Sequence, residues 1–177
     1  MVKRYCAFMR GMNIGRNVLK SADVCHDFRE SGMQDVSSLL VSGNILFSTD
    51  QPRQKLRPLL EEALSAKFNY AAVLFLKTPA ELNILLERCP FAESPEMHIY
   101  GFIHEAGVEM TLMPEFEAVS AVEEERAEVR SGAFYWQVPK GSTLDTPFAK
   151  VLGKKALRDQ FTSRNLNTLR KVAAKLG

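Results

Sequence analysis

The stretch VSSLLVSGNILFSTDQPRQKLRPLLEEALSAKF, residues 36–68, decides the fold because it joins two strand patterns to one long helix pattern. Residues 36–41 and 45–48 are expected to be short strands on either side of SGN, and glycine and asparagine tolerate the positive φ that hairpin turns require. From residue 52 to residue 68, leucine and alanine recur at helical spacing, with charged residues on the other faces. The stretch therefore predicts a β-hairpin followed by an amphipathic helix.

A strand and a helix precede this stretch, and another strand follows it. Tyr5–Met9 is apolar on both faces, which is typical of a strand in the middle of a sheet. Ser21–Ser31 has a helix pattern, with Ser21 as its expected N-cap and Gly32 at its C-terminal end. Ala71–Leu76 supplies a fourth strand. The order βαββαβ is that of the ferredoxin-like fold, in which an antiparallel sheet carries both helices on one face.

Strand and helix patterns alternate again in the second half of the chain. Thr78 as cap and Pro79 as first residue open a helix that runs to about Arg88. Further strands are expected at 98–103, 122–129 and 133–138, and helices at 114–120, at 145–152 and from near Ser163 onward. We interpret this as a second, degraded copy of the same unit. The chain is thus expected to be an α+β protein of two ferredoxin-like halves, residues 1–77 and 78–177, packed together and ending in a C-terminal helix.

The composition indicates a globular protein of the cytoplasm. Hydrophobic residues make up 46% and charged residues 25% of the chain, and no segment approaches the roughly 18 apolar residues that a membrane span needs. The N-terminal MVKRYCAF enters a strand pattern at once and lacks a signal-peptide core. Cys6, Cys25 and Cys89 have neither a CxxC nor a zinc-site spacing, so we expect buried free thiols and no metal.

Charge is distributed unevenly along the sequence, although the net charge is only +2. Basic residues dominate residues 1–21 and 150–177, whereas residues 105–128 are strongly acidic. Such asymmetry is compatible with an anionic partner, and equally with two solvated faces of opposite sign.

Standard catalytic and cofactor motifs are not found. GMNIG matches neither the Walker nor the Rossmann phosphate loop, so no cofactor is expected. His26, His98 and His104 form no HExxH motif, and we interpret each as an ordinary half-exposed histidine. Ser42 precedes a glycine but lacks the GxSxG elbow and an evident base partner.

Three polar segments remain, RGMNIG at 10–15, SGN at 42–44 and TSRNLNTLRK at 162–171. In a βαββαβ unit the first and third strands are antiparallel neighbours, so we expect the first two polar segments at the same end of the sheet. The third is expected to open the last helix, with Thr162 or Ser163 as N-cap, and a helix N-terminus beside an arginine suits an anion.

The candidate ligand-binding residues taken from these segments are Arg10, Asn13, Ser42, Asn44, Arg164, Asn165 and Thr168. On the last helix, Arg164, Asn165 and Thr168 have the spacing of one helical face. Each of the candidates also has a structural interpretation, as a turn residue, a cap or, for Arg164, the partner of an acid.

At these segments the chain resembles a bacterial family called domain of unknown function 1697. The motifs that carry the resemblance are RGMNIG after the first strand, VSGNILF, and TSRNLNT near the C-terminus. The resemblance implies two ferredoxin-like halves, and it implies no activity because none is established for the family. Two positions depart from the family's pattern: Leu166 stands where an aromatic residue is frequent, and Arg16 follows the glycine of the first loop.

Three functions are compatible with the sequence. The first is a binding module that holds a phosphate-bearing small molecule or a nucleic acid in a basic, amide-rich cleft, although the strands lack the aromatic pattern of an RNA-recognition domain. The second is a small metal-independent enzyme acting on an anionic substrate, for which no histidine or carboxylate in the polar segments offers a general base. The third is a protein-interaction domain.

Overall fold

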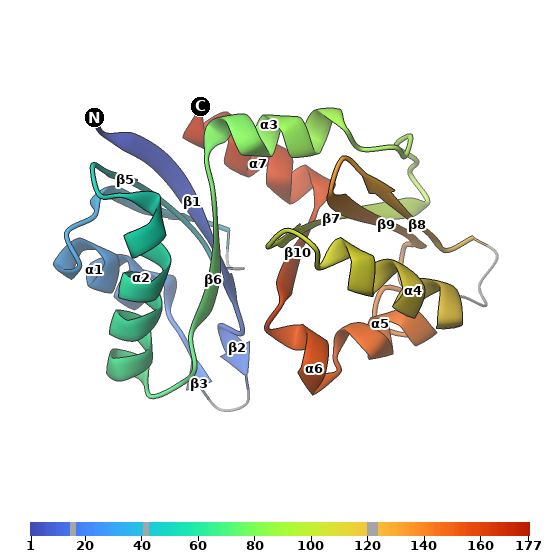
Figure 1. Ribbon diagram of the computed structural model, residues 1–177, viewed down its shortest axis with the longest axis horizontal. Coiled ribbons are helices and arrows are strands. Elements are labelled where there is room, and N and C mark those ends of the chain that lie inside the picture. The colour runs from blue at the N-terminus through green and yellow to red at the C-terminus, as the bar shows by residue number, and fades with distance from the viewer. Residues whose placement is uncertain (15–16, 41–42, 120–123) are drawn as a thin grey trace. The chain divides into compact units, whose positions relative to one another are not determined.

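The computed structural model describes residues 1–14, 17–40, 43–119 and 124–177 (Figure 1). The chain divides into two compact units, and each is described by itself. The first unit comprises residues 1–81 and 172–177, and the second comprises residues 82–171.

The first unit has the βαββαβ order that residues 1–77 predict. Its elements are β1 (Lys3–Arg10), β2 (Asn13–Ile14), β3 (Asn17–Val18), α1 (Ser21–Glu30), β4 (Gln34–Leu39), β5 (Asn44–Thr49), α2 (Arg53–Phe68) and β6 (Val73–Lys77). The four long strands form an antiparallel sheet in the order β4-β5-β1-β6, which is the ferredoxin-like order, and β2 pairs with β3 as a small separate ladder. The predicted hairpin and amphipathic helix are thus confirmed.

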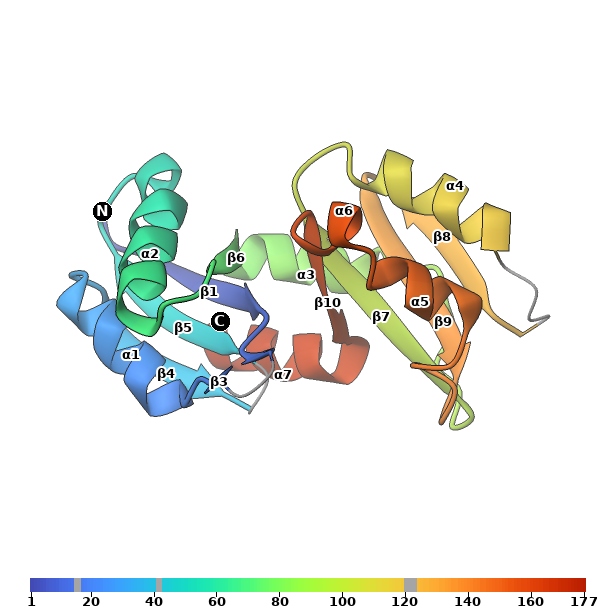
Figure 2. The same ribbon diagram turned by 90° about the horizontal axis from the view of Figure 1, so that it is seen from below.

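The core of the first unit lies between its sheet and the helices α1 and α2, which cover the same face of the sheet (Figures 1 and 2). The predicted stripe of α2 faces the core: Leu56, Leu60 and Leu64 have no exposed surface, and Leu59 and Ala63 are half-buried. Burying a leucine side chain contributes about 1.5–3 kcal/mol relative to leaving it in water. This stripe therefore anchors α2 to the sheet.

The predicted helix ends are confirmed in part. Gly32 follows α1 with φ +87°, and its N–H donates to the Arg29 carbonyl at 3.0 Å. Ser21, by contrast, is the first residue of α1 and not its cap, because Lys20 occupies the extended N-cap position without a side-chain hydrogen bond. At α3 (Pro79–Glu87) the Thr78 cap is confirmed: Thr78 N–H donates to Glu81 Oε2 at 2.8 Å, and Glu81 N–H to Thr78 Oγ1 at 3.3 Å.

The second unit repeats the same topology. Its elements are β7 (Met97–His104), α4 (Glu109–Val119), β8 (Arg126–Arg130), β9 (Ala133–Pro139), α5 (Pro147–Leu152), α6 (Lys155–Arg158), β10 (Phe161–Asn165) and α7 (Leu166–Leu176). The sheet order β10-β7-β9-β8 is again ferredoxin-like, so the interpretation as a second copy is confirmed. Helices α3 and α7 each have residues in both units.

An aromatic cluster forms the core of the second unit. Phe102 on β7 contacts Phe134 on β9 edge to face at a centroid distance of 4.8 Å, and Phe148 on α5 contacts Trp136 at 5.6 Å. Leu112 and Phe116 bring α4 onto the same cluster. Aromatic pairs of this geometry add about 0.5–1.5 kcal/mol each beyond the area they bury.

The prediction that the last helix begins near Ser163 is wrong. Residues 161–165 form strand β10, which pairs antiparallel with residues 100–104 of β7, and α7 begins at Leu166. The polar sequence TSRN resembles a helix cap, but the unfilled edge of β7 offers its backbone groups a ladder of partners.

Smaller differences concern element ends. The helix expected at 114–120 begins earlier, at Glu109, and the strand expected at 122–129 is Arg126–Arg130. The ends of these two predictions at residues 120 and 122–123, and that of the strand predicted at 36–41, lie outside the described residues.

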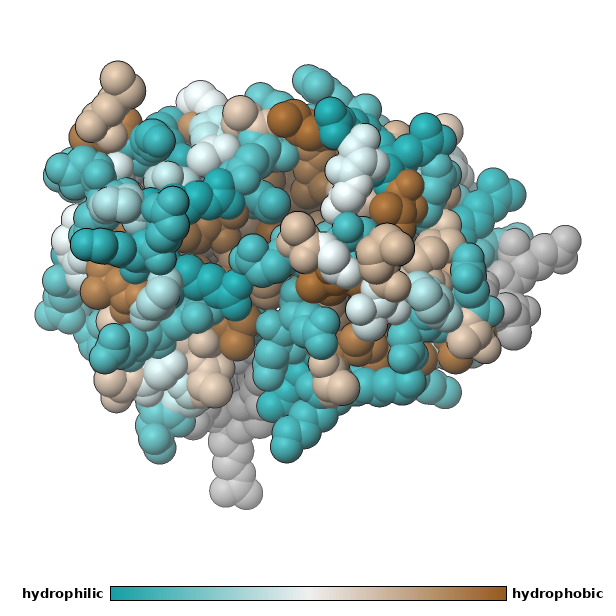
Figure 3. All heavy atoms as spheres, in the orientation of Figure 1, coloured by the Kyte–Doolittle hydropathy of each residue, from teal (hydrophilic) through white to brown (hydrophobic). Residues whose placement is uncertain are grey.

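The surface is mixed in polarity. On the face drawn in Figure 3, hydrophilic residues predominate between smaller groups of hydrophobic ones. Large apolar side chains that stay exposed include Met110 and Leu144, at 72% and 84%. None of the helices in the described part of the chain has both the length and the apolar character that crossing a membrane requires.

Candidate functional site

The first two polar segments meet at one end of the first sheet, as their topology predicts. Asn44, the first residue of β5, is the register partner of Phe8 on β1, and the Met9 N–H donates to the Gly43 carbonyl at 2.8 Å. Arg10 is the last residue of β1 and is half-buried. Asn13 lies on β2.

At this end of the sheet, Asn44 and Gly43 support the backbone conformation of the hairpin. Asn44 has no exposed surface, and its amide Nδ2 donates to the Leu39 carbonyl at 3.0 Å, across the hairpin that joins β4 to β5. Gly43 has φ +72°, a conformation that favours glycine. Ser42 and Gly15 lie outside the described residues. The structural interpretation of Asn44 is therefore supported, while a ligand-binding role for Arg10, Asn13 and Ser42 stays a prediction.

In the third polar segment, Arg164 lies on β10 and not on the last helix. Its Nη1 donates to Thr162 Oγ1 at 2.7 Å and to the Ser163 carbonyl at 2.9 Å, and the residue is only 9% exposed. The expectation that Arg164 shares a helical face with Thr168 is wrong for this reason. Thr168 is on α7 and half-buried. Since Arg10 and Asn44 belong to the first unit and Arg164 to the second, the convergence of all three polar segments stays a prediction.

Asn165 is the N-cap of α7. Its side-chain Oδ1 accepts the backbone N–H of Asn167 at 2.9 Å, which satisfies one of the N–H groups that the first turn of a helix leaves without an acceptor. With Oδ1 engaged in this way, the amide nitrogen of Asn165 is the part of the side chain that is left to bind a ligand.

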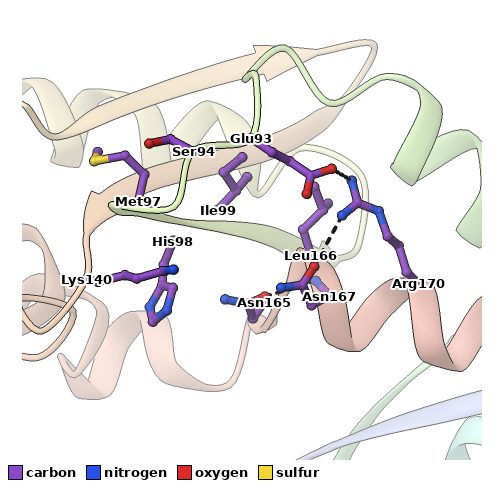
Figure 4. A pocket seen from close by; sticks show the side chains of 10 residues that line it. All are labelled: Glu93, Ser94, Met97, His98, Ile99, Lys140, Asn165, Leu166, Asn167 and Arg170. Carbon is purple, nitrogen blue, oxygen red and sulfur yellow. Dashed lines mark hydrogen bonds and ion pairs between the residues drawn. The ribbon is translucent and has the colours of Figure 1, made fainter.

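A hollow of about 140 Å³ lies in the second unit beside the start of α7, where β10 ends and β7 continues beyond it (Figure 4). Its walls are Glu93, Ser94, Met97, His98, Ile99, Lys140, Asn165, Leu166, Asn167 and Arg170. We name it the basic hollow because of Lys140, His98 and Arg170. Of the candidate ligand-binding residues predicted from the sequence, Asn165 lines the hollow, and the others that the structure describes do not.

The cations of the basic hollow differ in how they are held. Arg170 forms an ion pair with Glu93 and donates to Asn167 Oδ1 at 3.2 Å, so its charge is largely compensated. No carboxylate of the described residues lies within ion-pair distance of Lys140. Figure 4 shows the Lys140 ammonium and the Asn165 amide nitrogen both directed toward the His98 ring. This arrangement concentrates donors on one side of the hollow.

His98 has a buried atom without a partner. Its Nδ1 is buried and makes no hydrogen bond to any described residue, and its ring contacts Tyr100 edge to face at 6.1 Å. A buried polar atom usually has a partner, because leaving it without one costs about 1–3 kcal/mol.

Sequence reasoning missed His98 and Lys140. Lys140 follows β9 and His98 lies on β7, and the two come together with Asn165 because β7 and β9 are adjacent strands. The sequence signal for His98 was a histidine at the start of a predicted strand, next to polar loops. Histidines in such positions are also common in proteins that have no functional site there. The described residues contain no group of three or more His, Cys, Asp or Glu side chains that could hold a metal ion.

Comparisons with solved structures place the fold. Conserved bacterial protein SP0830 from Streptococcus pneumoniae is similar with a TM-score of 0.80 and 21% sequence identity, over 99% of both chains. An unknown protein from Galdieria sulphuraria has 11% identity over 93% of this chain and 99% of its own, but with a TM-score of 0.27. The first likeness shows a shared fold, and the second carries no argument. No curated protein matches the chain.

A family model described as "Protein of unknown function (DUF1697)" matches residues 2–135, which include the first unit's sheet, β7, β8 and the first residues of β9. The chain belongs to this family of proteins of unknown function.

Proposed function

We propose that the protein is a binding module for a small phosphate-bearing molecule, whose anionic group occupies the basic hollow of the second unit. The observation that carries the proposal is the hollow itself, in which the ammonium of Lys140 and the amide of Asn165 lie beside the first turn of α7. The N-terminus of an α-helix has free N–H groups and a partial positive charge, and both favour an anion.

Charge supports an anion over a neutral ligand. Lys140 has no carboxylate partner among the described residues, and an ammonium next to a helix N-terminus raises the local potential. Glu93 lies in the wall of the hollow, where its ion pair with Arg170 limits its repulsion of an incoming anion. The imidazole of His98 can complete the set as a hydrogen-bonding group.

Size supports a small anionic group. The hollow of about 140 Å³ is several times the ~30 Å³ that a water molecule occupies in the liquid, and it is smaller than the ~300–1,000 Å³ of pockets for drug-sized ligands. A phosphate group with part of its ester fits this range.

The proposal also places the protein in the bacterial cytosol, where free thiols such as the buried Cys6 and Cys25 persist.

The test is a titration with inorganic phosphate, followed by calorimetry or by amide chemical shifts, at two salt concentrations. The Lys140→Gln variant is expected to weaken phosphate binding at least tenfold, and Lys155→Gln, which removes the same charge from an exposed position outside the hollow, is expected to leave it unchanged. Saturable binding that both variants reduce equally would contradict the proposed site, and so would the absence of any saturable binding by the wild type.

A specific observation also favours a second candidate, a metal-independent enzyme acting on an anionic substrate. Sequence reasoning found no general base, whereas the structure places His98 in the wall of the basic hollow beside Lys140 and Asn165. A histidine next to a bound phosphate ester is a general base that takes a proton from an attacking water. Candidate phosphomonoesters would be tested by measuring released inorganic phosphate. We expect His98→Gln to lose turnover and the exposed His26→Gln to keep it. Equal turnover in both variants would refute the catalytic role.

A further inference from the structure

A second, more open hollow of about 590 Å³ adjoins the basic hollow in the same unit. The two share Ser94 and Met97 in their walls. These residues bracket a tight turn, in which the Met97 N–H donates to the Ser94 carbonyl at 3.3 Å and the Ser94 hydroxyl accepts the Glu96 N–H at 3.2 Å. The turn is therefore part of the wall of both hollows.

The second hollow has a different chemistry from the first. Beyond the shared wall it is lined by Gln137 on β9, by Arg126 on β8 and by Glu124. Gln137 and Arg126 are register partners, so their side chains leave the same face of the sheet. The amide nitrogen of Gln137 donates to the Ala92 carbonyl at 3.4 Å, which leaves its oxygen as an acceptor. The guanidinium of Arg126 is planar and stacks on flat rings, and the thioether of Met97 packs against apolar faces.

We propose that the two hollows form one site for a molecule with a single anionic end and a planar, uncharged, hydrogen-bonding body, as in a nucleoside monophosphate. The anionic end lies in the basic hollow, so this inference rests on the proposed function. The planar body lies against Met97 and Arg126, where the amide of Gln137 meets its polar edge. The carboxylate of Glu124 is then available to accept from hydroxyl or amino groups.

An acidic residue selects against a longer polyanion. Glu124 lines the second hollow, so an extended strand carrying a phosphate at each step would bring negative charge against its carboxylate. Like charges at contact distance are unfavourable, and proteins that bind nucleic acid strands instead present continuous basic grooves. The charge pattern thus favours a small molecule over a nucleic acid.

The size of the second hollow agrees with this division. Its volume of about 590 Å³, open to solvent, is more than a second phosphate group would fill, so it has room for a planar body.

The experiment compares dissociation constants for inorganic phosphate, adenosine and guanosine 5′-monophosphates, adenosine, and a single-stranded oligonucleotide, all measured with the full chain. We expect at least one monophosphate to bind tenfold or more tightly than inorganic phosphate. Gln137→Met and Arg126→Ala should lower this preference, the ratio of the two dissociation constants, at least fivefold. Lys140→Gln should weaken both ligands. Arg130→Ala, on the same strand as Arg126 but outside both hollows, is the matched control and should change neither.

The possible results separate the two proposals. If inorganic phosphate binds in a manner that depends on Lys140 but no monophosphate binds more tightly, the extended site is refuted and the proposed function stands. If neither ligand binds, both are refuted. Tighter binding of the oligonucleotide than of every monophosphate would refute the assignment to a small molecule. Circular dichroism of each variant establishes that a lost preference does not come from unfolding.

Discussion

Replacing Gly43 with alanine should destabilise the first unit more than the same replacement at Gly32. Both glycines are in the first unit and have positive φ, +72° and +87°, so the conformational penalty for an added Cβ is similar. They differ in the space around them. A Cβ on Gly43 would lie 2.6 Å from Met12 Sδ and 3.1 Å from Met9 Cβ, whereas at Gly32 the nearest atom, of Gln51, is 3.6 Å away.

The magnitude follows from two contributions. An L-residue in the left-handed region costs roughly 1–2 kcal/mol, and this applies to both variants. Forcing an extra carbon into a packed site costs typically about 1–3 kcal/mol, and this applies to Gly43 alone, because the Met12 side chain can move but Met9 Cβ sits on the strand backbone. We therefore expect Gly43→Ala to lower the free energy of unfolding by about 2–5 kcal/mol and Gly32→Ala by about 1–2 kcal/mol.

Urea denaturation measures both values, with far-ultraviolet circular dichroism following the transition. The difference between the two variants is the informative quantity, because the shared backbone penalty cancels. Equal destabilisation would refute the reasoning and would mean that the contact with the first polar segment can relax freely. A smaller loss for Gly43→Ala than for Gly32→Ala would contradict it more strongly.

Three further predictions concern single contacts. Glu81→Ala breaks the capping box with Thr78 and should cost about 1–2 kcal/mol at pH 7. Burial alone would raise the pKa of Glu81, but hydrogen bonds, led by that from the Thr78 N–H, hold it below its usual value. The stabilisation of the wild type by ionised Glu81 should thus be complete above the pKa of this group in the unfolded chain, about 4.3. It should be lost as the pH falls through the lower pKa in the folded protein, as urea titrations across pH would reveal. Asn165→Asp keeps an acceptor for the first turn of α7 but adds a negative charge to the basic hollow, so thermal stability should stay within about 0.5 kcal/mol while phosphate affinity falls at least tenfold. Gly101→Ala would place a Cβ 2.8 Å from Leu169 Cδ1 and should lower the free energy of unfolding by about 1–3 kcal/mol. In a double-mutant cycle with Leu169→Ala, the double variant should lose less stability than the sum of the two single losses.

Local sequence was sufficient for the elements whose pattern and packing agree. The α2 stripe of Leu56, Leu60 and Leu64 has helical spacing wherever the helix docks, and the turn at Gly43 requires a conformation that favours glycine in any context. These elements predict the βαββαβ order of both units. That order in turn predicts that the first two polar segments lie at the same end of a sheet. These features depend on short-range geometry, which the sequence contains.

Strand β10 and the basic hollow depended on partners far away in the chain. Thr162 and Arg164 look like the polar start of a helix, but they are buried in a strand because β7 has a free edge that their backbone can pair with. His98 and Lys140 lie 42 positions apart by their numbering, and neither has a neighbour in sequence that marks it as a site. Only strand pairing brings them together with Asn165. The sequence alone thus determined the elements and their order, whereas the tertiary structure decided which side chains share a hollow, because that sharing depends on which strand edges meet and not on any local pattern.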